Sequence, residues 1–503
     1  MRKSGEAIPA LTSGALARMA EHVETRSSAA WMRIRSRTMR AVFEEAAARV
    51  PAYRDFLQKH GTDITASFAR VPQTDKKDYL KKYPLSELCY DGSLARASVF
   101  SSTSGSTGTP FYFPRLPNLE EQYSVLIELF LRNGAHRPGP ESPTLVIIAF
   151  GMGVWIGGTL TYRAFDIASR RGYPVSILPA GVNKTEILKA LHDLAPSFKQ
   201  VIIAGYPPFV KDVLDEAAFE GIDLKSLNIR LLFAAEAFTE HFRDYLAEKT
   251  GMKNVYRDTL NIYGTADIGA MAFETPTAIL VRRLALEHPV IYGRLFGKMK
   301  KTPTLAQYNP AFTSFEAPAG DILLTGASAL PLVRYAVGDR GGVHSFTDVE
   351  HLCAEAGIDL RREAVRYDVP LYELPFVYVY ERSDLATTLY GLQIYPDYLR
   401  DLMVSPLLQQ FCTGKFQIIQ KYDEKQNQYL EINIEQKRGV ESIKASFAAE
   451  VEAAVTLAFR EKSSEYKELS SLVQDRPLFV LVFHPADDPE HFSSGAKQKW
   501  VKK

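Results

Sequence analysis

The segment SSTSGSTGTPFYFP, Ser101–Pro114, is a run of small residues that ends at a proline and continues into aromatic residues. Every residue from Ser101 to Thr109 is Ser, Thr or Gly. Backbone N–H groups of such residues can approach an anion closely, and the hydroxyls add donors, so the loop can surround a polyphosphate. A flexible linker is the alternative reading of a Ser/Gly tract. The flanking RASVF and FYF segments place the run inside a domain, which favours an anion-binding loop that is neither a Walker A nor a GxGxxG motif.

The composition narrows the class of protein. A chain of 503 residues predicts two or more domains. Lys plus Arg number 60 and Asp plus Glu 59, so no overall charge attracts nucleic acid or acidic membranes. The three cysteines are far apart and form no CxxC pair, which argues against disulfides and a cysteine zinc site and predicts a reducing, cytoplasmic location.

Neither the N-terminus nor the uncharged segment at 142–162 has the pattern of a targeting or membrane signal. The N-terminus lacks a sustained apolar core, so we expect no secretory signal. Residues 142–162 carry no charge and are long enough to span a bilayer, but glycines interrupt them. We therefore predict a buried strand, a glycine turn and a packed helix there, and no membrane span.

Between residues 119 and 290, short apolar runs alternate with helical patterns. We predict helices at 16–60 and 119–133, and strands within TLVIIAF, PVSILPA, QVIIAG, IRLLFAA and NVYRDTLNIYG. This alternation predicts βαβ units and a mostly parallel sheet, with a ligand outside the carboxyl ends of the strands.

The pattern changes after residue 290. GDILLTGAS, LPLVRYAVGDRGGVHSF and VPLYELPFVYVYERSD predict antiparallel strands, and a helix is expected between 344 and 380. Residues 396–503 predict an α+β module with a helix at 396–411, a hairpin at 414–437, a helix at 443–463 and a strand at 477–485. The expected domains are 1–381 and 382–503.

Several segments resemble motifs of the adenylate-forming superfamily, which includes acyl-CoA synthetases, adenylation domains and luciferases. TSGSTGTP, Thr103–Pro110, resembles its phosphate loop. Four further resemblances follow in the order of the family: NIYGTADIG (Asn261–Gly269), LVRYAVGDR (Leu332–Arg340), ERSDLATTLYGLQIYPDYL (Glu381–Leu399) and SGAKQKWVKK (Ser494–Lys503). The hinge segment, VPAYRDFLQKHG and AGYPPFV resemble the phenylacetate-CoA ligase branch.

The resemblance covers residues 50 to 503 and implies a fold. That fold is α/β, with a large N-terminal domain of mixed, mostly parallel sheets and a β-barrel-like part. A small mobile α+β C-terminal domain carries the catalytic lysine and turns at Asp384, which could otherwise be a solvated loop charge.

The resemblance also implies a nucleotide site that binds ATP and Mg²⁺. The phosphate-binding residues are Ser102, Thr103, Ser104, Gly105, Ser106, Thr107 and Gly108. Phe111 stands where many relatives have a lysine, as in phenylacetate-type enzymes. Asp267 replaces the family's glutamate as the expected Mg²⁺ ligand, next to Gly264 and Thr265 of the same motif. Alternatively, Asp267 caps a helix after the YGTA turn.

Further residues follow from the same resemblance. Tyr263 is expected beside the adenine, or is simply a core aromatic. Asp339 is expected to accept both ribose hydroxyls, or is an ordinary β-turn aspartate after Gly338. Arg382 is expected to contact the ribose or a phosphate.

Lys497 is the expected catalytic lysine, because negative charge develops around the α-phosphorus when a carboxylate attacks it. The family pattern Gly-Lys-x-x-Arg-Val is altered here to Ala496 before and Trp500 after, and Lys499 is the rival. A frayed basic tail is the alternative. Around the acid, we expect Glu236 at a strand end and a pocket of Trp155, Gly157 and Tyr206, although these residues could equally pack a core.

Three functions remain open at this stage. The first is ATP-dependent activation of an aryl or related small carboxylic acid and transfer of its acyl group to coenzyme A. The second transfers the acyl group to an amine, a small nitrogen nucleophile or a carrier protein. The third is a nucleotide-binding regulator without turnover. The 344–380 segment could be a specificity lid, a homodimer contact or a spacer.

Overall fold

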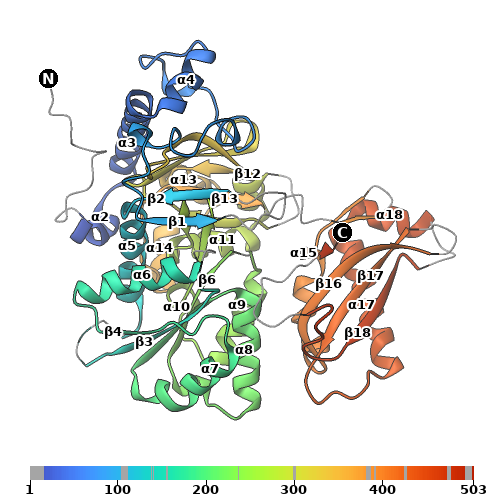
Figure 1. Cartoon of the computed structure of the whole chain (residues 1–503). Coiled ribbons are helices and arrows are strands. Elements are labelled where there is room, and N and C mark those ends of the chain that lie inside the picture. The colour runs from blue at the N-terminus through green and yellow to red at the C-terminus, as the bar shows by residue number, and fades with distance from the viewer. Residues whose placement is uncertain are drawn as a thin grey trace.

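The computed structural model describes the chain except for residues 1–15, 103–110, 137–138, 140, 154–156, 236, 298–301, 381–386, 390–391, 424–427, 473–476, 493–500 and 503. Most of the chain forms a large α/β body, and the C-terminal elements lie beside it as a smaller unit (Figure 1). The predicted N-terminal helical region is confirmed as α2 (Met19–Thr25), α3 (Ser28–Arg49) and α4 (Pro51–Lys59).

A mixed sheet organises the large body. In the described part of the chain its strand order is β10-β11-β12-β13-β9-β8-β7-β6-β5-β3-β4. The parallel half confirms the predicted βαβ pattern and consists of β3 (Thr144–Ala149), β4 (Val175–Leu178), β5 (Gln200–Gly205), β6 (Ile229–Ala234) and β7 (Thr259–Thr265). Its helices are α6 (Gly157–Arg170), α7 (Lys184–Lys189), α8 (Pro207–Phe219), α9 (Glu240–Thr250) and α10 (Val255–Asp258).

Both faces of β3, β5 and β6 are buried, which explains their continuous apolar runs, whereas the edge strand β4 is partly exposed. Along β3, Leu145 and Ile147 pack into one core while Val146 and Ile148 pack into another on the opposite face. The uncharged segment at 142–162 is therefore a core strand followed by α6, as predicted. No helix in the described residues is long and apolar enough to cross a membrane.

The second half of the sheet is antiparallel, as predicted after residue 290. Its strands are β8 (Gly269–Phe273), β9 (Thr304–Gln307), β10 (Thr313–Glu316), β11 (Asp321–Gly326), β12 (Leu332–His344) and β13 (Phe376–Tyr380). The 344–380 segment contains two helices where one was expected, α13 (Phe346–Glu355) and α14 (Leu360–Arg366). They share a core with α11 (Pro276–Glu287) and α12 (Pro289–Phe296).

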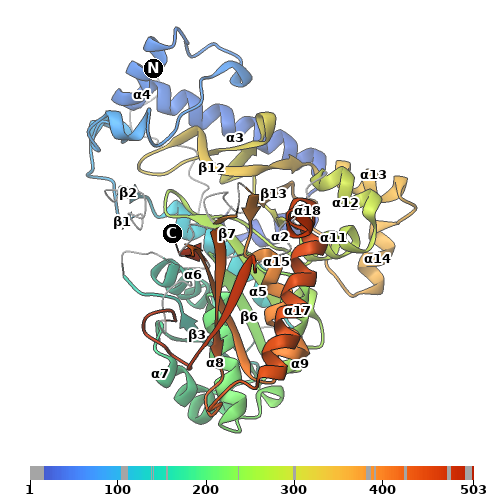
Figure 2. The same cartoon turned by 90° about the vertical axis from the view of Figure 1, so that its right-hand side faces the viewer.

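The C-terminal unit has a sheet of its own, ordered β18-β17-β16-β19. Figure 2 shows this unit in front of the large body. Its core consists of residues between Leu389 and Phe479. The elements are β14 (Thr387–Leu389), β15 (Leu392–Ile394), α15 (Asp397–Met403), α16 (Pro406–Gln409), β16 (Cys412–Tyr422), β17 (Gln428–Gln436), α17 (Ala445–Lys462), α18 (Ser464–Leu472), β18 (Phe479–His484) and β19 (Val501–Lys502). The predicted domain boundary itself lies outside the described residues.

Candidate active site

The predicted phosphate loop connects a two-stranded hairpin. β1 (Val99–Ser102) pairs antiparallel with β2 (Tyr112–Arg115), and Ser102 lies opposite Tyr112. Thr103, Ser104, Gly105, Ser106, Thr107 and Gly108 lie outside the described residues. Because the two strands end opposite each other, the hairpin fixes where the loop begins and ends.

A buried arginine attaches this hairpin to the turn that contains Asp267. The guanidinium of Arg115 donates from Nε to Ser101 Oγ at 2.9 Å and from Nη2 to the Ala266 carbonyl at 2.6 Å. Ser101 Oγ donates to the same carbonyl at 2.9 Å. Burial lowers the pKa of Arg115 to about 10, against the attraction of Asp267 and Glu120. The fold thus brings the ends of the phosphate loop to the proposed metal ligand.

Asp267 lies in the turn between β7 and β8. Tyr335 Oη donates to Asp267 Oδ2 at 2.9 Å, and the Asp267 amide donates to Thr265 Oγ1 at 3.2 Å. Strand β8 follows the turn, so the alternative of a helix cap at Asp267 is wrong. Gly264 permits the tight turn, since a Cβ there would lie 2.6 Å from the Gly269 carbonyl oxygen.

Tyr263 and Asp339 meet across two distant strands. Tyr263 Oη donates to Asp339 Oδ2 at 2.6 Å. The half-buried Tyr263 ring also packs on the core near Phe315, 6.1 Å between centroids, so it belongs both to the core and to the site. The expectation of a β-turn at Asp339 is wrong: Asp339 lies within β12, at an irregularity where the pairing with β11 shifts and Gly338 takes a φ of +87°.

The loop after β6 lies at the same carboxyl edge as the turn after β7. It begins with Ala235 at a φ of +75°, a conformation that non-glycine residues rarely adopt and that concentrates at functional sites. The Ala237 carbonyl accepts from Arg400 Nη1 and the Phe238 carbonyl from Arg282 Nη2, both at 2.7 Å. Glu236, the predicted acid-site residue, lies outside the described residues.

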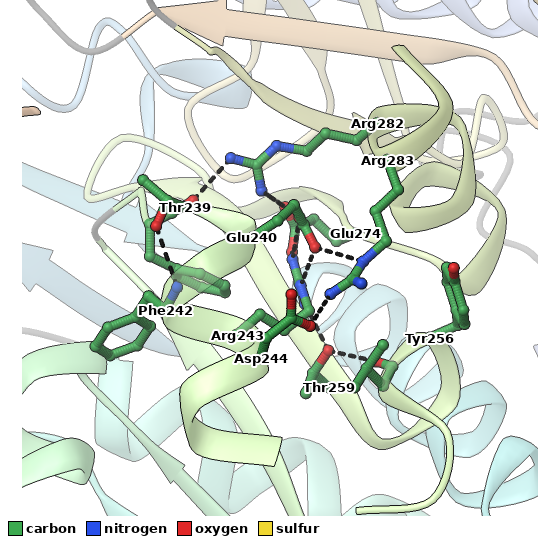
Figure 3. A network of polar contacts seen from close by, with 12 residues as sticks. Thr239, Glu240, Phe242, Arg243, Asp244, Tyr256, Thr259, Glu274, Arg282 and Arg283 are labelled. Carbon is green, nitrogen blue, oxygen red and sulfur yellow. Dashed lines mark hydrogen bonds and ion pairs between the residues drawn. The ribbon is translucent and has the colours of Figure 1, made fainter. Parts of the chain in front are cut away.

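The loop is followed by a network of charged side chains from α9, α11 and the segment after β8 (Figure 3). Glu240 accepts from Arg243 and Arg282 at 2.9 Å and from Arg283 at 2.7 Å, while Glu274 accepts from Arg243 at 2.7 Å. Burial alone would raise the pKa of Glu240, but the guanidiniums outweigh it and hold the pKa at about 2. The start of α9 is thereby fixed beside the candidate site.

Two residues of the predicted acid pocket, Tyr206 and Gly157, lie near the same side chain. Tyr206 packs edge-on against Phe150, with 5.0 Å between ring centroids. A Cβ at Gly157 would lie 3.9 Å from the same Phe150 ring, so Gly157 and Tyr206 share one neighbour. Trp155 lies outside the described residues.

A small cleft opens nearby, where the C-terminal unit meets α8 and α9. It is lined by Pro207, Ala237, Phe238, Phe242, Arg400 and Val404, among others.

The remaining predicted residues are Arg382, Asp384 and Lys497, with its rival Lys499, and all four lie outside the described residues. Val501 and Lys502 nevertheless form β19, which pairs parallel with β16 at Ile418 and Ile419. The tail is therefore not frayed at these two positions.

Sequence reasoning missed Arg115 and Tyr335. Their only signal was a charged residue inside the apolar segment FYFPRLP and a tyrosine in the Asp339 motif.

No protein-family model and no curated protein matches the sequence. Solved structures do match. A 2-hydroxyisobutyryl-CoA ligase in the postadenylation state, bound to an acyl-AMP, aligns with a TM-score of 0.65 at 15% identity over 96% of this chain and 91% of that one. The same ligase in the thioesterification state gives 0.52 at 16% identity over 96% and 91%. The acyl acid amido synthetase GH3.15 gives 0.59 at 12% identity over 99% and 95%. The chain has the fold of adenylate-forming enzymes.

Proposed function

We propose that this chain is an AMP-forming ligase that activates a carboxylic acid with ATP and passes the acyl group to coenzyme A. One observation carries the proposal: Arg115 and Ser101 join the hairpin of the Ser/Thr/Gly loop to the Ala266 carbonyl, directly before Asp267. The Tyr263–Asp339 pair extends the same arrangement across the sheet. The neighbours that share the fold support it, because one is a CoA ligase bound to an acyl-AMP.

In the first step a substrate carboxylate oxygen attacks the α-phosphorus of ATP, the bond to the β-phosphate oxygen breaks, and pyrophosphate leaves. Residues Ser102 to Gly108 bind the β- and γ-phosphates, and Asp339 accepts the ribose hydroxyls. Asp267 is a partly exposed carboxylate and suits Mg²⁺, which prefers oxygen ligands and would neutralise phosphate charge when bound. Lys497 stabilises the charge at the α-phosphate.

In the second step the thiolate of coenzyme A attacks the acyl carbon, the bond to the AMP oxygen breaks, and AMP leaves. We propose that residues 382–503 act as a lid that turns at Asp384 between the two steps. Glu236, Trp155, Gly157 and Tyr206 line the acid pocket in this proposal, Arg382 contacts the nucleotide, and the enzyme belongs to a phenylacetate-CoA ligase-like branch. The three buried free cysteines suit a cytoplasmic enzyme.

The second candidate is transfer to an amine. It is supported by the alignment with an acyl acid amido synthetase over 99% of this chain. A carrier protein as acceptor and a homodimer remain sequence-based predictions.

The decisive experiment is a pyrophosphate-release screen over aryl and aliphatic acids with MgATP, with and without coenzyme A or an amine. We expect acid-dependent release and a thioester product, strongly reduced in Lys497→Ala and retained in the matched Lys499→Ala variant. No acid-dependent release with any acid would contradict the proposal. Release that is indifferent to coenzyme A, together with an amide product, would favour the amine. Full activity of Lys497→Ala would remove that residue's role.

A further inference from the structure

Three side chains with metal-binding atoms converge at the end of β18, away from the nucleotide site. Asp488 Oδ2 lies 3.0 Å from Nδ1 of His484 and 3.0 Å from Nδ1 of His491. The two imidazole rings stack with 4.0 Å between their centroids. The side chains of His484, Asp488 and His491 are 15%, 19% and 13% exposed, so the cluster is largely buried but still reached by water.

The orientation of His484 is fixed by a fully buried amide. Asn433 donates from Nδ2 to Glu431 Oε1 at 3.2 Å, which directs Asn433 Oδ1 to His484 Nε2 at 2.6 Å. Because Oδ1 only accepts, Nε2 carries the proton, and a neutral imidazole then has its lone pair on Nδ1. That lone pair faces a carboxylate oxygen at 3.0 Å.

Two facing lone pairs repel unless a second proton or a cation lies between them. Histidine bound to a metal through one nitrogen commonly donates its other N–H to a carbonyl or carboxylate, as His484 does to Asn433. The cluster therefore has both the ligand atoms and the supporting hydrogen bond of a metal site.

We propose that His484, Asp488 and His491 bind one divalent transition-metal ion, with zinc as the best match to the donor set. Two imidazoles and one carboxylate form the protein ligand set of some zinc sites, in which water takes the fourth coordination position. Ligand atoms in a tetrahedral zinc shell lie about 3.3 Å apart, close to the 3.0 Å separations in this cluster. The ligands are nitrogen-rich, so Mg²⁺, which prefers oxygen, is disfavoured.

The site ties the chain after β18 to the C-terminal sheet. His484 lies opposite Glu435 of β17, and the Asp487 amide donates to Glu435 Oε1 at 3.0 Å. The metal closes the segment from His484 to His491 into a loop whose conformation is fixed at both ends. Lys497 follows His491 by six positions in the sequence.

The test uses untagged full-length protein, stripped with a chelator and desalted, without ATP. Zn²⁺ is titrated calorimetrically, and Co²⁺ is followed by its visible absorption, which reports nitrogen ligation in a low-coordinate shell. We expect one equivalent per chain, a raised melting temperature with Zn²⁺, and no displacement of Co²⁺ by excess Mg²⁺. His491→Ala and the near-isosteric Asp488→Asn should each weaken binding by more than about 100-fold.

The matched control is His351→Ala, which removes an exposed histidine that contacts Glu355. It should bind the metal as the parent protein does. Absence of stoichiometric binding overturns the proposal, and so does equal binding by the parent, Asp488→Asn and His491→Ala. Circular dichroism of each variant establishes that the fold is retained, and Asp488→Asn serves where His491→Ala does not fold.

Discussion

At the scale of single residues, Tyr335 orients the proposed metal ligand. Its hydroxyl donates to Asp267 at 2.9 Å, and its ring is only 1% exposed, so the donor is held in place by the core. Tyr335→Phe removes that hydrogen bond and keeps the ring. Since a hydrogen bond to a charged group contributes about 1.5–3 kcal/mol, we expect at least about a 10-fold loss in kcat/KM for MgATP. Pyrophosphate release measured against Mg²⁺ concentration should show a higher Mg²⁺ requirement.

Tyr53→Phe is the control for that variant. Tyr53 belongs to the same core, and its hydroxyl has no hydrogen-bond partner among the described residues. It should leave catalysis unchanged. An unaltered Mg²⁺ dependence in Tyr335→Phe would show that the orientation of Asp267 does not matter to catalysis.

Asp339 carries the second prediction at this scale. It accepts a 2.6 Å hydrogen bond from Tyr263 and is proposed to accept the ribose hydroxyls. Asp339→Asn loses the negative charge, which should raise the KM for ATP roughly 10- to 100-fold while the KM for the acid changes little. Steady-state kinetics with each substrate varied in turn measures this. The control is Asp321→Asn, which changes a carboxylate on the neighbouring strand in an exposed ion pair with Arg340, and its KM values should match those of the parent. If Asp339→Asn raises the KM for ATP and the KM for the acid equally, the role of Asp339 is structural.

At the scale of elements, periodicity predicted the βαβ strands well. It failed where a helix cap or a proline interrupted an expected strand or helix. The segment NVYRDTLNIYG was expected to be one strand, but α10 occupies its first half because Asn254 caps the amides of Tyr256 and Arg257. The helix expected at 396–411 divides into α15 and α16 because Pro406 cannot continue it. Helix α18 and strand β19 were not predicted.

The β1–β2 hairpin is the element that carries the proposed phosphate loop, and Arg115 anchors this hairpin. Arg115→Lys keeps the charge but loses the planar fork that reaches Ser101 and Ala266 at once. We expect the KM for ATP to rise about 10-fold, the effect of losing one charge-assisted hydrogen bond. The measurement is an ATP titration of pyrophosphate release with a parallel thermal melt. Arg163→Lys, at a more exposed pair with Glu120, is the matched control; if both variants behave alike, the hairpin anchor is not needed.

At the scale of the whole molecule, the C-terminal unit is held to the large body by polar contacts around α8. Lys415 Nζ lies 2.6 Å from Asp212, Arg438 donates to Glu216 at 2.9 Å, and Lys211 donates to the Thr413 carbonyl. Arg400 adds its bond to the Ala237 carbonyl. Polar contacts of this kind are compatible with the proposed lid movement, because interfaces between mobile domains are commonly polar.

The sequence predicted that Tyr263, Asp267 and Asp339 belong to one site, but it did not predict which contacts hold the two parts of the chain together. Tyr263, Asp267 and Asp339 follow from motifs whose order in the chain is preserved. Asp212 and Lys415 belong to no motif, and each looks like a surface charge on an amphipathic element. Only the arrangement of the C-terminal sheet against α8 makes them a buried pair, because the burial of a charge depends on tertiary contacts that no local pattern records.

That pair gives the last prediction. Burial raises the pKa of Asp212 to about 6, despite the attraction of Lys415 and Lys211. A carboxyl whose folded pKa lies above its unfolded value of 3.8 contributes stability below that value, and the contribution is lost as pH rises from about 4 to 6. Asp212→Asn mimics the protonated form. Relative to the parent, it should therefore gain unfolding free energy between pH 4 and pH 7, and the gain should grow as the pH rises through this range.

Asp215 lies one helical turn away on α8, and its pKa is shifted in the opposite direction. Burial opposes its charge, but Lys211 and Lys249 outweigh it and lower its pKa to about 2. Asp215→Asn should therefore destabilise the protein at pH 7, and its deficit should shrink as pH falls toward 2. Urea unfolding of the parent and both variants across this range compares them directly. If the two asparagine variants change stability with the same sign at pH 7, then burial does not govern Asp212, and its contact with Lys415 is a net stabilising ion pair.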